Sequence, residues 1–266
     1  MQLAIQQAAE LIHNSKNLIA FAGAGLSAES GIPTFRGDEG IWKKYPPIIY
    51  GNLPGLALSF ALRPKRFREF VSSAVSAFVK AEPNPGHLAL GELFKRGLLK
   101  AVITQNIDDL ERRAGVKEVI QLHGSIYKMR CLRCKRIFEI SRERLLEALT
   151  ELEKLSGRWS LVRFGRALSR CPECKGNRRP DIVFFGEGLN PSDYQRAIAL
   201  ARGADLMLIL GTSGVVYPAG LIPSYAHRAG AKIIEINPEP TVLSHLAEIE
   251  IKAQSAEALP QIVKLL

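Results

Sequence analysis

Residues 17–31 read NLIAFAGAGLSAESG, an apolar run of strand length followed by a glycine-rich turn. Gly23 and Gly25 permit a tight turn from a strand into a helix, where exposed N–H groups and the helix dipole accept a pyrophosphate. The pattern is weak by itself, because the third glycine of the usual dinucleotide fingerprint is missing and a bare packing turn looks the same. It predicts a strand, a turn and a helix, with a nucleotide site as one of two interpretations.

The chain beyond this stretch alternates strand-length apolar runs with helical patterns. The runs are LKAVITQN (99–106), VIQLHG (119–124), ADLMLILG (204–211), AKIIEIN (231–237) and EIEIKA (248–253). Strands buried on both faces read as continuous apolar runs, and the connections are long enough to contain crossover helices. The sequence therefore predicts an α/β fold with an open, mostly parallel, doubly wound sheet.

Unusual residues follow four of the predicted strands. The tails are GAGLSAESG, TQNIDD, LHG and GTSGVVYPAG. Ligands of such sheets bind beyond the carboxyl ends of the strands, so these tails form the candidate site. No acidic residue ends a second strand about 20 positions after the glycines, as ribose recognition in ordinary dehydrogenases requires. A bound nucleotide is therefore not expected in the usual hydride-transfer arrangement.

Length and composition suit one large α/β domain with a small second module. The chain has 266 residues, of which 47% are hydrophobic. Its longest apolar runs fall short of the roughly 18 residues that a membrane helix needs. Residues 1–15 have a helical apolar stripe and lack the basic start and small-residue cleavage site of a signal peptide. These features predict a cytoplasmic protein, or a nuclear one if the cell has a nucleus.

Positive charge is concentrated in residues 128–179, which hold 15 lysines and arginines against 6 glutamates, or +9 of the chain's +10. Such a field attracts an anionic partner, and a nucleic acid, a nucleic-acid-binding protein or another acidic protein face would fit. The alternative is a solvated basic surface that aids solubility. We expect no aromatic side chain among the basic ones for base stacking, and this favours the alternative.

All four cysteines fall in the same segment, as two C-x-x-C pairs. Cys131 and Cys134 belong to CLRC, and Cys171 and Cys174 belong to CPEC. Two such pairs offer four thiolates to one tetrahedral zinc ion, and a complete set of protein ligands leaves no open position for catalysis. Disulfides and a redox C-x-x-C are the alternatives. Residues 141–155, between the pairs, read as an inserted amphipathic helix, so the segment is predicted to be a zinc-binding module with one structural ion.

A series of motifs occurs in the order seen in sirtuins. The motifs are GAGLSAESGIPTFRG, TQNIDDLERRAG, LHG, the paired C-x-x-C sequences, IVFFGE, GTSGVVYPA and INPEP. The chain resembles this family, in its prokaryotic type, over its whole length. Sirtuins are NAD-dependent protein lysine deacylases, and the resemblance implies that activity, with NAD consumed as a co-substrate.

The resemblance also implies a domain organisation. Residues 1–33, 81–125 and 181–266 would form a Rossmann-like NAD-binding domain. Residues 34–80 would contain a cofactor-binding loop and a helical insertion, and residues 126–180 the zinc-binding module. The loop, the insertion and the zinc module would together make the smaller domain.

A set of NAD-binding residues follows from the same resemblance. It comprises Ala22, Gly23, Ala24, Gly25, Ile32, Phe35, Arg36, Gln105, Asn106, Asp108, Gly211, Thr212, Ser213 and Asn237. Phe35 would shield the reacting ribose from water, Arg36 would meet the phosphates, and Gln105 would bond the nicotinamide ribose. Asn106 and Asp108 would form the pocket for the nicotinamide carboxamide, an amide that needs both a donor and an acceptor.

The residue types alone leave other interpretations open for these positions. Phe35 suits the packing of a core, and Arg36 suits a surface ion pair. Asn106, Asp108 and Asp109 precede LERRAG and suit the capping of a helix.

His123, which ends a predicted strand before a glycine, is the candidate general base, and Asn106 is the second catalytic candidate. An imidazole pKa near 6.5 suits proton transfer at neutral pH, although a lone histidine is more often structural. In the mechanism that the family implies, the acyl-lysine oxygen attacks C1′ of the nicotinamide ribose and nicotinamide leaves. His123 then deprotonates the ribose so that its 2′-hydroxyl attacks the alkylamidate, and water releases lysine and O-acyl-ADP-ribose.

The acylated protein substrate is expected to bind as an extended strand between FGEGLNP and GVVYPAG. The residues implied are Val183, Phe184, Gly186, Glu187 and Val216. FGEGLNP differs by one residue from the commoner family pattern.

Acyl preference is expected to follow the helical insertion. Sirtuins that favour succinyl or malonyl groups carry a Tyr-x-x-Arg pair there, and this chain has Val71 and Ala74 in the nearest alignment. Neither side chain binds a carboxylate, so neutral acyl groups are expected, although Arg66 and Arg68 stand nearby.

Two rival functions remain open at this stage. A protein ADP-ribosyltransferase would use the same NAD site and pass the ribose to a protein nucleophile. A zinc-dependent DNA-binding protein that senses NAD without consuming it would use the basic module, but His123 and Asn106 count against it.

Overall fold

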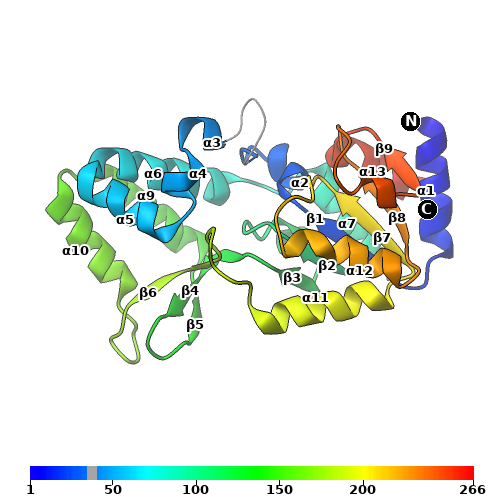
Figure 1. The fold of residues 1–266 in the computed structure, drawn as a ribbon. Coiled ribbons are helices and arrows are strands. Elements are labelled where there is room, and N and C mark those ends of the chain that lie inside the picture. The colour runs from blue at the N-terminus through cyan, green and yellow to red at the C-terminus, as the bar shows by residue number, and fades with distance from the viewer. Residues whose placement is uncertain (35–40) are drawn as a thin grey trace. The chain divides into compact units, whose positions relative to one another are not determined.

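The computed structural model describes residues 1–34 and 41–266, which divide into two compact units (Figure 1). Unit 1 consists of residues 1–32, 82–123 and 189–266. Unit 2 consists of residues 33–81 and 124–188.

Unit 1 contains a six-stranded sheet in the order β3-β2-β1-β7-β8-β9, and every paired strand is parallel to its neighbour. The strands are β1 (Leu18–Ala22), β2 (Leu99–Thr104), β3 (Val119–Gln121), β7 (Leu206–Leu210), β8 (Lys232–Ile236) and β9 (Ile249–Ile251). The strand order reverses between β1 and β7. A doubly wound sheet binds its ligands beyond the carboxyl ends of the strands at such a reversal.

Helices cover both faces of this sheet. One face is packed by α1 (Gln2–Asn14), α7 (Pro85–Lys95) and α13 (Ser255–Val263), and the other by α11 (Pro191–Gly203) and α12 (Ile222–Arg228). The sequence of β1 is apolar throughout because its successive side chains face two cores. Ala20 packs in one core and Phe21 in the other. The predicted Rossmann-like sheet is confirmed. The short elements of unit 1 are α2 (Ala24–Ala28), α8 (Leu110–Arg113), η1 (Ala219–Leu221) and η2 (Ser244–Leu246).

Unit 2 contains a three-stranded antiparallel sheet in the order β5-β4-β6. Its strands are β4 (Gly124–Cys131), β5 (Ile137–Glu139) and β6 (Arg178–Ile182), and its helices are α3 (Ile41–Lys44), α4 (Pro47–Tyr50), α5 (Leu53–Leu62), α6 (Pro64–Lys80), α9 (Arg142–Lys154) and α10 (Arg158–Ser169). The helix expected at 141–155 is α9, and Ser141 caps it by accepting a hydrogen bond from the Arg144 N–H at 3.2 Å. Helix α10 was not predicted.

The division into units differs from the sequence-based domain boundaries mainly at residues 181–188, which belong to unit 2. Asp181 and Ile182 pair with β4, and Gly124 lies so close to this strand that a Cβ on it would meet the Asp181 carbonyl oxygen at 1.8 Å. Strand β6 therefore holds this segment to the small sheet. Among the described residues, no helix combines the length and apolar character that crossing a bilayer requires.

Candidate functional site

Two strand-end loops meet backbone to backbone at the point where the strand order of unit 1 reverses. The Gly23 N–H donates to the Leu210 oxygen at 2.9 Å, and the Gly25 N–H donates to the Gly211 oxygen at 2.8 Å. A Cβ on Gly25 would stand 2.7 Å from the Gly211 Cα, and Gly211 has φ +54. Both glycines are therefore required for the loops to touch. The glycine-rich turn therefore packs against the loop after β7, and the two loops together form the floor of the candidate nucleotide site.

Gln105 and Thr212 join the ends of β2 and β7. The Gln105 Nε2 donates to the Thr212 Oγ1 at 2.8 Å, and the Gln105 backbone N–H donates to the Ala22 oxygen at 3.0 Å. Thr212 is buried, whereas Ser213 beside it is exposed. These predicted site residues thus stand together across three neighbouring strands.

Asn106 is tied to the glycine turn by its side-chain amide. Its Nδ2 donates to the Gly23 oxygen at 3.0 Å and to the Ser27 Oγ at 3.1 Å, and the residue is 6% exposed. Asn106 does not cap α8, so the alternative interpretation is wrong for this residue. The amide is held in one orientation and leaves its oxygen as the group available to a donor.

His87 is a member of this network that the sequence analysis missed. It is fully buried, its Nε2 lies 3.4 Å from the Ser27 Oγ, and its Nδ1 accepts a hydrogen bond from the Asn84 N–H at 3.3 Å. Burial lowers the pKa of His87 to about 4, so the ring is neutral at physiological pH. The signal in the sequence was Asn84, which forms the capping box of α7 with His87.

Two buried carboxyl groups lie one helical turn apart where β2 leads into α8. Asp108 is 1% exposed, and its Oδ1 accepts a hydrogen bond from the Leu110 N–H at 3.0 Å. Asp108 therefore bonds the first N–H of α8, as the helix-capping interpretation predicts. Burial raises the pKa of Asp108. Burial and the charge of Asp108 raise the pKa of Glu111, which is fully buried, to about 8.

His123 follows β3, next to the end of β2. Its Nδ1 lies 2.9 Å from the backbone oxygen of Gln105. A carbonyl oxygen can only accept, so Nδ1 carries the proton and Nε2 has the free lone pair. Burial lowers the pKa of His123 below its ordinary value, and the bond to Gln105 partly opposes this shift. The neutral ring is thereby kept in the tautomer of a general base.

The remaining predicted NAD-binding residues lie at several places around the sheet. Ala22 ends β1, Ala24 begins α2, and Ile32 is buried beyond that helix. Asn237 follows β8 and donates from Nδ2 to the Glu239 oxygen at 2.6 Å. Phe35 and Arg36 lie outside the described residues.

The four cysteines form one cluster in unit 2. Their sulfur atoms all lie within 4.8 Å of one another, with 3.4 Å between Cys131 and Cys174 and 3.8 Å between Cys134 and Cys171. A tetrahedral ion with Zn–S bonds of about 2.3 Å separates its sulfurs by about 3.8 Å, so the cluster fits zinc. These separations are too long for disulfides. Backbone N–H groups, that of Cys134 first, lower the pKa of Cys131 to about 6.

The residues predicted to bind the peptide come from both units, and Val216 alone belongs to unit 1. In unit 2, Glu187 is bonded by Arg179 through both carboxylate oxygens, at 2.5 and 2.7 Å. It also accepts the Phe184 N–H at 3.0 Å, and the Arg179 guanidinium lies 5.1 Å from the Phe184 ring centre. Glu187 therefore shapes its own loop, and Arg179, which the sequence analysis missed, is the residue that holds it.

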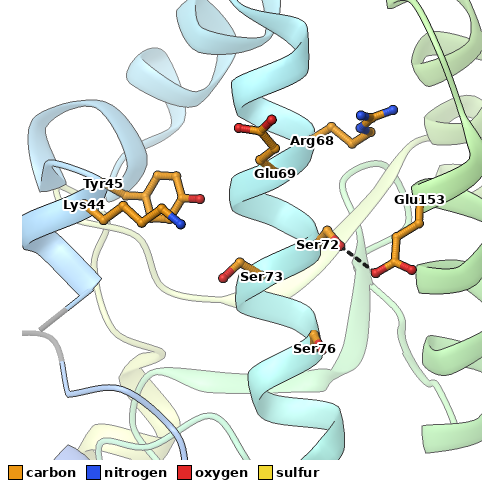
Figure 2. A pocket seen from close by; sticks show the side chains of 8 residues that line it. All are labelled: Lys44, Tyr45, Arg68, Glu69, Ser72, Ser73, Ser76 and Glu153. Carbon is orange, nitrogen blue, oxygen red and sulfur yellow. Dashed lines mark hydrogen bonds between the residues drawn. The ribbon is translucent and has the colours of Figure 1, made fainter. Parts of the chain in front are cut away.

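A polar cavity of about 420 Å³ lies along α6 in unit 2 (Figure 2). Its lining residues are Lys44, Tyr45, Arg68, Glu69, Ser72, Ser73, Ser76 and Glu153. The Ser72 hydroxyl donates to Glu153 at 3.0 Å across it. No predicted site residue lines this cavity, and its charges of both signs indicate no particular ligand.

A family model for the Sir2 family matches residues 23–218. The chain belongs to the Sir2 family. Curated relatives include the NAD-dependent protein deacylase of Pyrococcus abyssi, which is 41% identical over 97% of this chain and 96% of the relative. The NAD-dependent protein deacylase of Thermococcus kodakarensis is 43% identical over 97% of this chain and 93% of the relative.

Solved structures of Sir2 proteins share the fold of this chain. The crystal structure of a Sir2 homologue–NAD complex matches with a TM-score of 0.79 and 36% identity, and the match covers 97% of this chain and 92% of the other. A Sir2–p53 peptide–NAD⁺ complex matches with a TM-score of 0.77 and 31% identity over 98% and 97% of the two chains.

Proposed function

We propose that this Sir2 protein is an NAD-dependent protein lysine deacylase that yields nicotinamide, O-acyl-ADP-ribose and free lysine. The observation that carries the proposal is the hydrogen bond from His123 Nδ1 to the Gln105 carbonyl, 2.9 Å long, at the carboxyl edge of the sheet. It provides a general base next to the glycine turn and the buried polar pair. The relatives named NAD-dependent protein deacylases support the same activity.

NAD fits the residues at this edge of unit 1. When bound, it supplies an electrophilic C1′ in its nicotinamide ribose, with nicotinamide as the leaving group. Gly25 and Gly211 let the two loops touch at this edge, and Thr212 presents a hydroxyl that Gln105 already orients. The phosphates and ribose would lie along these loops, as the NAD complex of the Sir2 homologue supports.

Asn106 and Asp108 would hold the nicotinamide carboxamide. Asn106 donates both of its N–H groups internally, so its oxygen would accept from the ligand amide. Asp108 accepts the Leu110 N–H at Oδ1, and its second oxygen, Oδ2, would accept from the ligand amide. Burial raises the pKa of Asp108 above its ordinary value.

His123 would act after nicotinamide has left the pocket. Its Nε2 would remove the proton of a ribose hydroxyl, while the Gln105 carbonyl stabilises the imidazolium that forms. The peptide would approach as a strand along Val183, Phe184, Gly186, Glu187 and Val216, using backbone hydrogen bonds with little sequence selectivity. The four cysteines would hold a zinc ion that stabilises the fold and takes no part in the reaction.

A peptide with acetyl-lysine tests the proposal when it is incubated with the full chain and NAD labelled in the adenine ring. Mass spectrometry should find free lysine and one O-acetyl-ADP-ribose for each nicotinamide released. Label that remains on protein in place of these products would instead identify a protein ADP-ribosyltransferase. If no nicotinamide is released, both enzymatic functions are refuted, and a protein that senses NAD without consuming it remains.

Two further features of the chain are independent of this activity. A cytoplasmic location remains a prediction, which the metal-type arrangement of the four cysteines supports. We also propose that the basic segment 128–179 binds an anionic partner, because it holds +9 of the chain's +10 net charge.

A further inference from the structure

Helix α10 of unit 2 carries a basic stripe that ends in an exposed aromatic side chain. Trp159, Arg163, Arg166 and, at the helix end, Arg170 follow at spacings of four, three and four residues, which places them on one helical face. Trp159 is 75% exposed, and the three arginines are exposed as well. We call these four residues the α10 stripe.

The opposite face of α10 packs against the rest of unit 2. Leu161 is 7% exposed, and Phe164 and Leu168 are half-buried on the same side. The backbone is fixed as well, since Arg178 donates to the Leu168 oxygen at 2.9 Å and Arg158 donates to the Ala61 oxygen at 3.2 Å. The apolar face is therefore not available for insertion into a lipid surface, and the stripe is presented on an anchored helix.

The charges of the α10 stripe are not neutralised within the described part of the chain. No acidic residue occurs between Glu153 and Glu173, and no ion pair joins Arg163, Arg166 or Arg170 to a described carboxylate. Other arginines of the same basic segment are paired with carboxylates. These are Arg130 with Asp181, Arg136 with Glu173, Arg144 with Glu147 and Arg179 with Glu187. A continuous part of the segment's uncompensated charge thus lies on α10, although Lys128, Arg133 and Lys135 also have no ion pair with a described carboxylate.

Trp159 changes the interpretation of this charge. The expectation that no aromatic side chain stands among the basic residues is wrong, because Trp159 adjoins Arg158 and shares a face with Arg163. The Arg158 guanidinium lies 6.0 Å from the Trp159 ring centre. An exposed indole whose partner is an arginine has a ring face on which a nucleobase can stack.

We propose that the α10 stripe binds single-stranded nucleic acid, and this rests on the proposed anionic partner of the basic segment. The arginines from 163 to 170 span about 10 Å along the helix at 1.5 Å per residue, which suits contacts to two or three successive phosphates. Trp159 stacks on a base, which single strands expose and duplexes hide. An acidic protein would satisfy the arginines but would have no use for the exposed ring.

Fluorescence anisotropy with a labelled mixed-sequence single-stranded oligonucleotide, its duplex and a poly-glutamate peptide tests the inference on the full chain. The wild type should bind the single strand most tightly. Since each neutralised phosphate contributes about 0.7 to the salt slope of a single strand, the triple variant Arg163→Gln, Arg166→Gln, Arg170→Gln should reduce that slope by about 2. Trp159→Ala should weaken single-strand binding by at least about 5-fold and leave duplex binding unchanged.

A matched control removes equal charge from unit 1, through Arg228→Gln, Lys252→Gln and Lys264→Gln, three exposed positions. It should leave binding within about 2-fold of wild type, since the effect is local. Deacetylation of a peptide and the melting temperature should stay at wild-type values in all variants, which excludes misfolding as the cause.

Three outcomes would overturn the inference in different ways. Equal binding by wild type and the α10 triple variant would refute the stripe but retain an anionic partner elsewhere in 128–179. A wild type that binds no oligonucleotide and no poly-glutamate would refute the anionic partner as well. Tighter binding of poly-glutamate, insensitive to Trp159→Ala, would identify an acidic protein as the partner. None of these results bears on the deacylase activity.

Discussion

The Nδ1 atom of His123 lies 2.9 Å from the backbone oxygen of Gln105. This contact joins the residue that follows β3 to the residue that follows β2, so the sheet itself sets the tautomer of the base. We therefore expect His123→Ala to lose at least about 100-fold in deacylation, a typical contribution of a general base, while still binding NAD. NAD binding is measured by calorimetry, and wild-type turnover in this variant would contradict the assignment.

The hydrogen bond between His123 and Gln105 also predicts how kcat/KM for deacylation depends on pH. A base must be unprotonated to act, and burial lowers the pKa of His123 below 6.5. The acidic limb of the kcat/KM profile should therefore have its midpoint below pH 6.5, with activity falling as the pH drops through it. A midpoint above 6.5 that depends on His123 would show that a carboxylate faces the ring in the working enzyme.

The zinc site predicts a loss of structure in unit 2 when one ligand is removed. Cys131→Ser should release the metal and unfold the small sheet, because a structural zinc ion contributes its binding free energy to folding. Leu132→Ser is the matched control, since Leu132 adjoins the ligand and is 51% exposed. Metal content and tryptic cleavage within 124–188 are the measurements. A Cys131 variant with one bound zinc and wild-type cleavage would refute the four-thiolate site.

Glu111 predicts a pH dependence of stability. Its pKa is about 8 in the folded protein and near 4.5 when exposed, so folding binds a proton and the free energy of unfolding falls as the pH rises between these values. Glu111→Gln removes this loss, and the stability of wild type relative to the variant should fall by up to about 1.4 kcal/mol per pH unit in the window.

His87 acts in the opposite direction over part of this range. Its folded pKa of about 4 lies below the ordinary 6.5, so stability is lost as the pH falls from 6.5 towards 4. The difference between wild type and Glu111→Gln cancels this contribution, which is present in both. Glu250→Gln, at an exposed position of β9, is the control, and its stability curve should run parallel to that of wild type. A constant difference between wild type and Glu111→Gln from pH 5 to 8 would contradict the burial argument.

The contact between Gly25 and Gly211 at the strand reversal predicts that a side chain at Gly25 disturbs the structure there. Gly25→Ala would place its Cβ 2.7 Å from the Gly211 Cα, so the two loops must separate. We expect a loss of about 1–3 kcal/mol in stability and a raised KM for NAD. Gly165→Ala, in α10 with no atom within 4 Å of its added Cβ, should instead stabilise the chain by about 0.5–1 kcal/mol. Thermal melting and steady-state kinetics on both variants measure this, and equal effects would contradict it.

The centre of the sheet could be predicted because its two central strands, β1 and β7, are buried on both faces. All five residues of Leu206–Leu210 are buried, so the run is apolar throughout and needs no alternation to be recognised. The four zinc ligands could be predicted because two short spacings bring the thiols together without knowledge of the rest of the fold.

Helix α10 and the buried polar network could not be read in the same way. Gly165 and β-branched Val162 weaken the helical pattern of α10, and its apolar residues Leu161, Phe164 and Leu168 were the signal that was missed. His87 and Glu111 lie on short or amphipathic helices where a polar residue is expected at the surface. Their burial depends on which strand ends each helix meets, and a local pattern does not contain that information.

The last prediction concerns the choice of acyl group. Val71 and Ala74 are half-buried on α6 and have no polar atom in their side chains. The two arginines near them have partners in the structure. Arg66 donates to the Lys44 oxygen at 3.4 Å, and Arg68 donates to the Leu155 oxygen. Each guanidinium thus has one N–H held by a backbone oxygen, and these contacts direct it toward Lys44 or Leu155.

A succinyl-lysine would bring a carboxylate into the acyl site, and burial of a charge without a cationic partner costs several kcal/mol. A penalty of only about 1.4 kcal/mol gives a tenfold ratio, so acetyl-lysine peptide should have a kcat/KM at least about tenfold higher than its succinyl equivalent. Longer neutral acyl chains should also react, because an apolar tunnel discriminates weakly between methylenes. Competition on one peptide that bears either acyl group measures the ratio.

Variants separate the two explanations of this ratio. The double variant Val71→Tyr, Ala74→Arg should raise the succinyl rate relative to the acetyl rate, because it supplies the missing cation and hydroxyl. Arg66→Ala and Arg68→Ala should leave the ratio at its wild-type value. A wild-type preference for succinyl that either alanine variant abolishes would mean that this arginine leaves its carbonyl partner and reaches the acyl group, and that α6 has been aligned incorrectly with the insertion of other sirtuins.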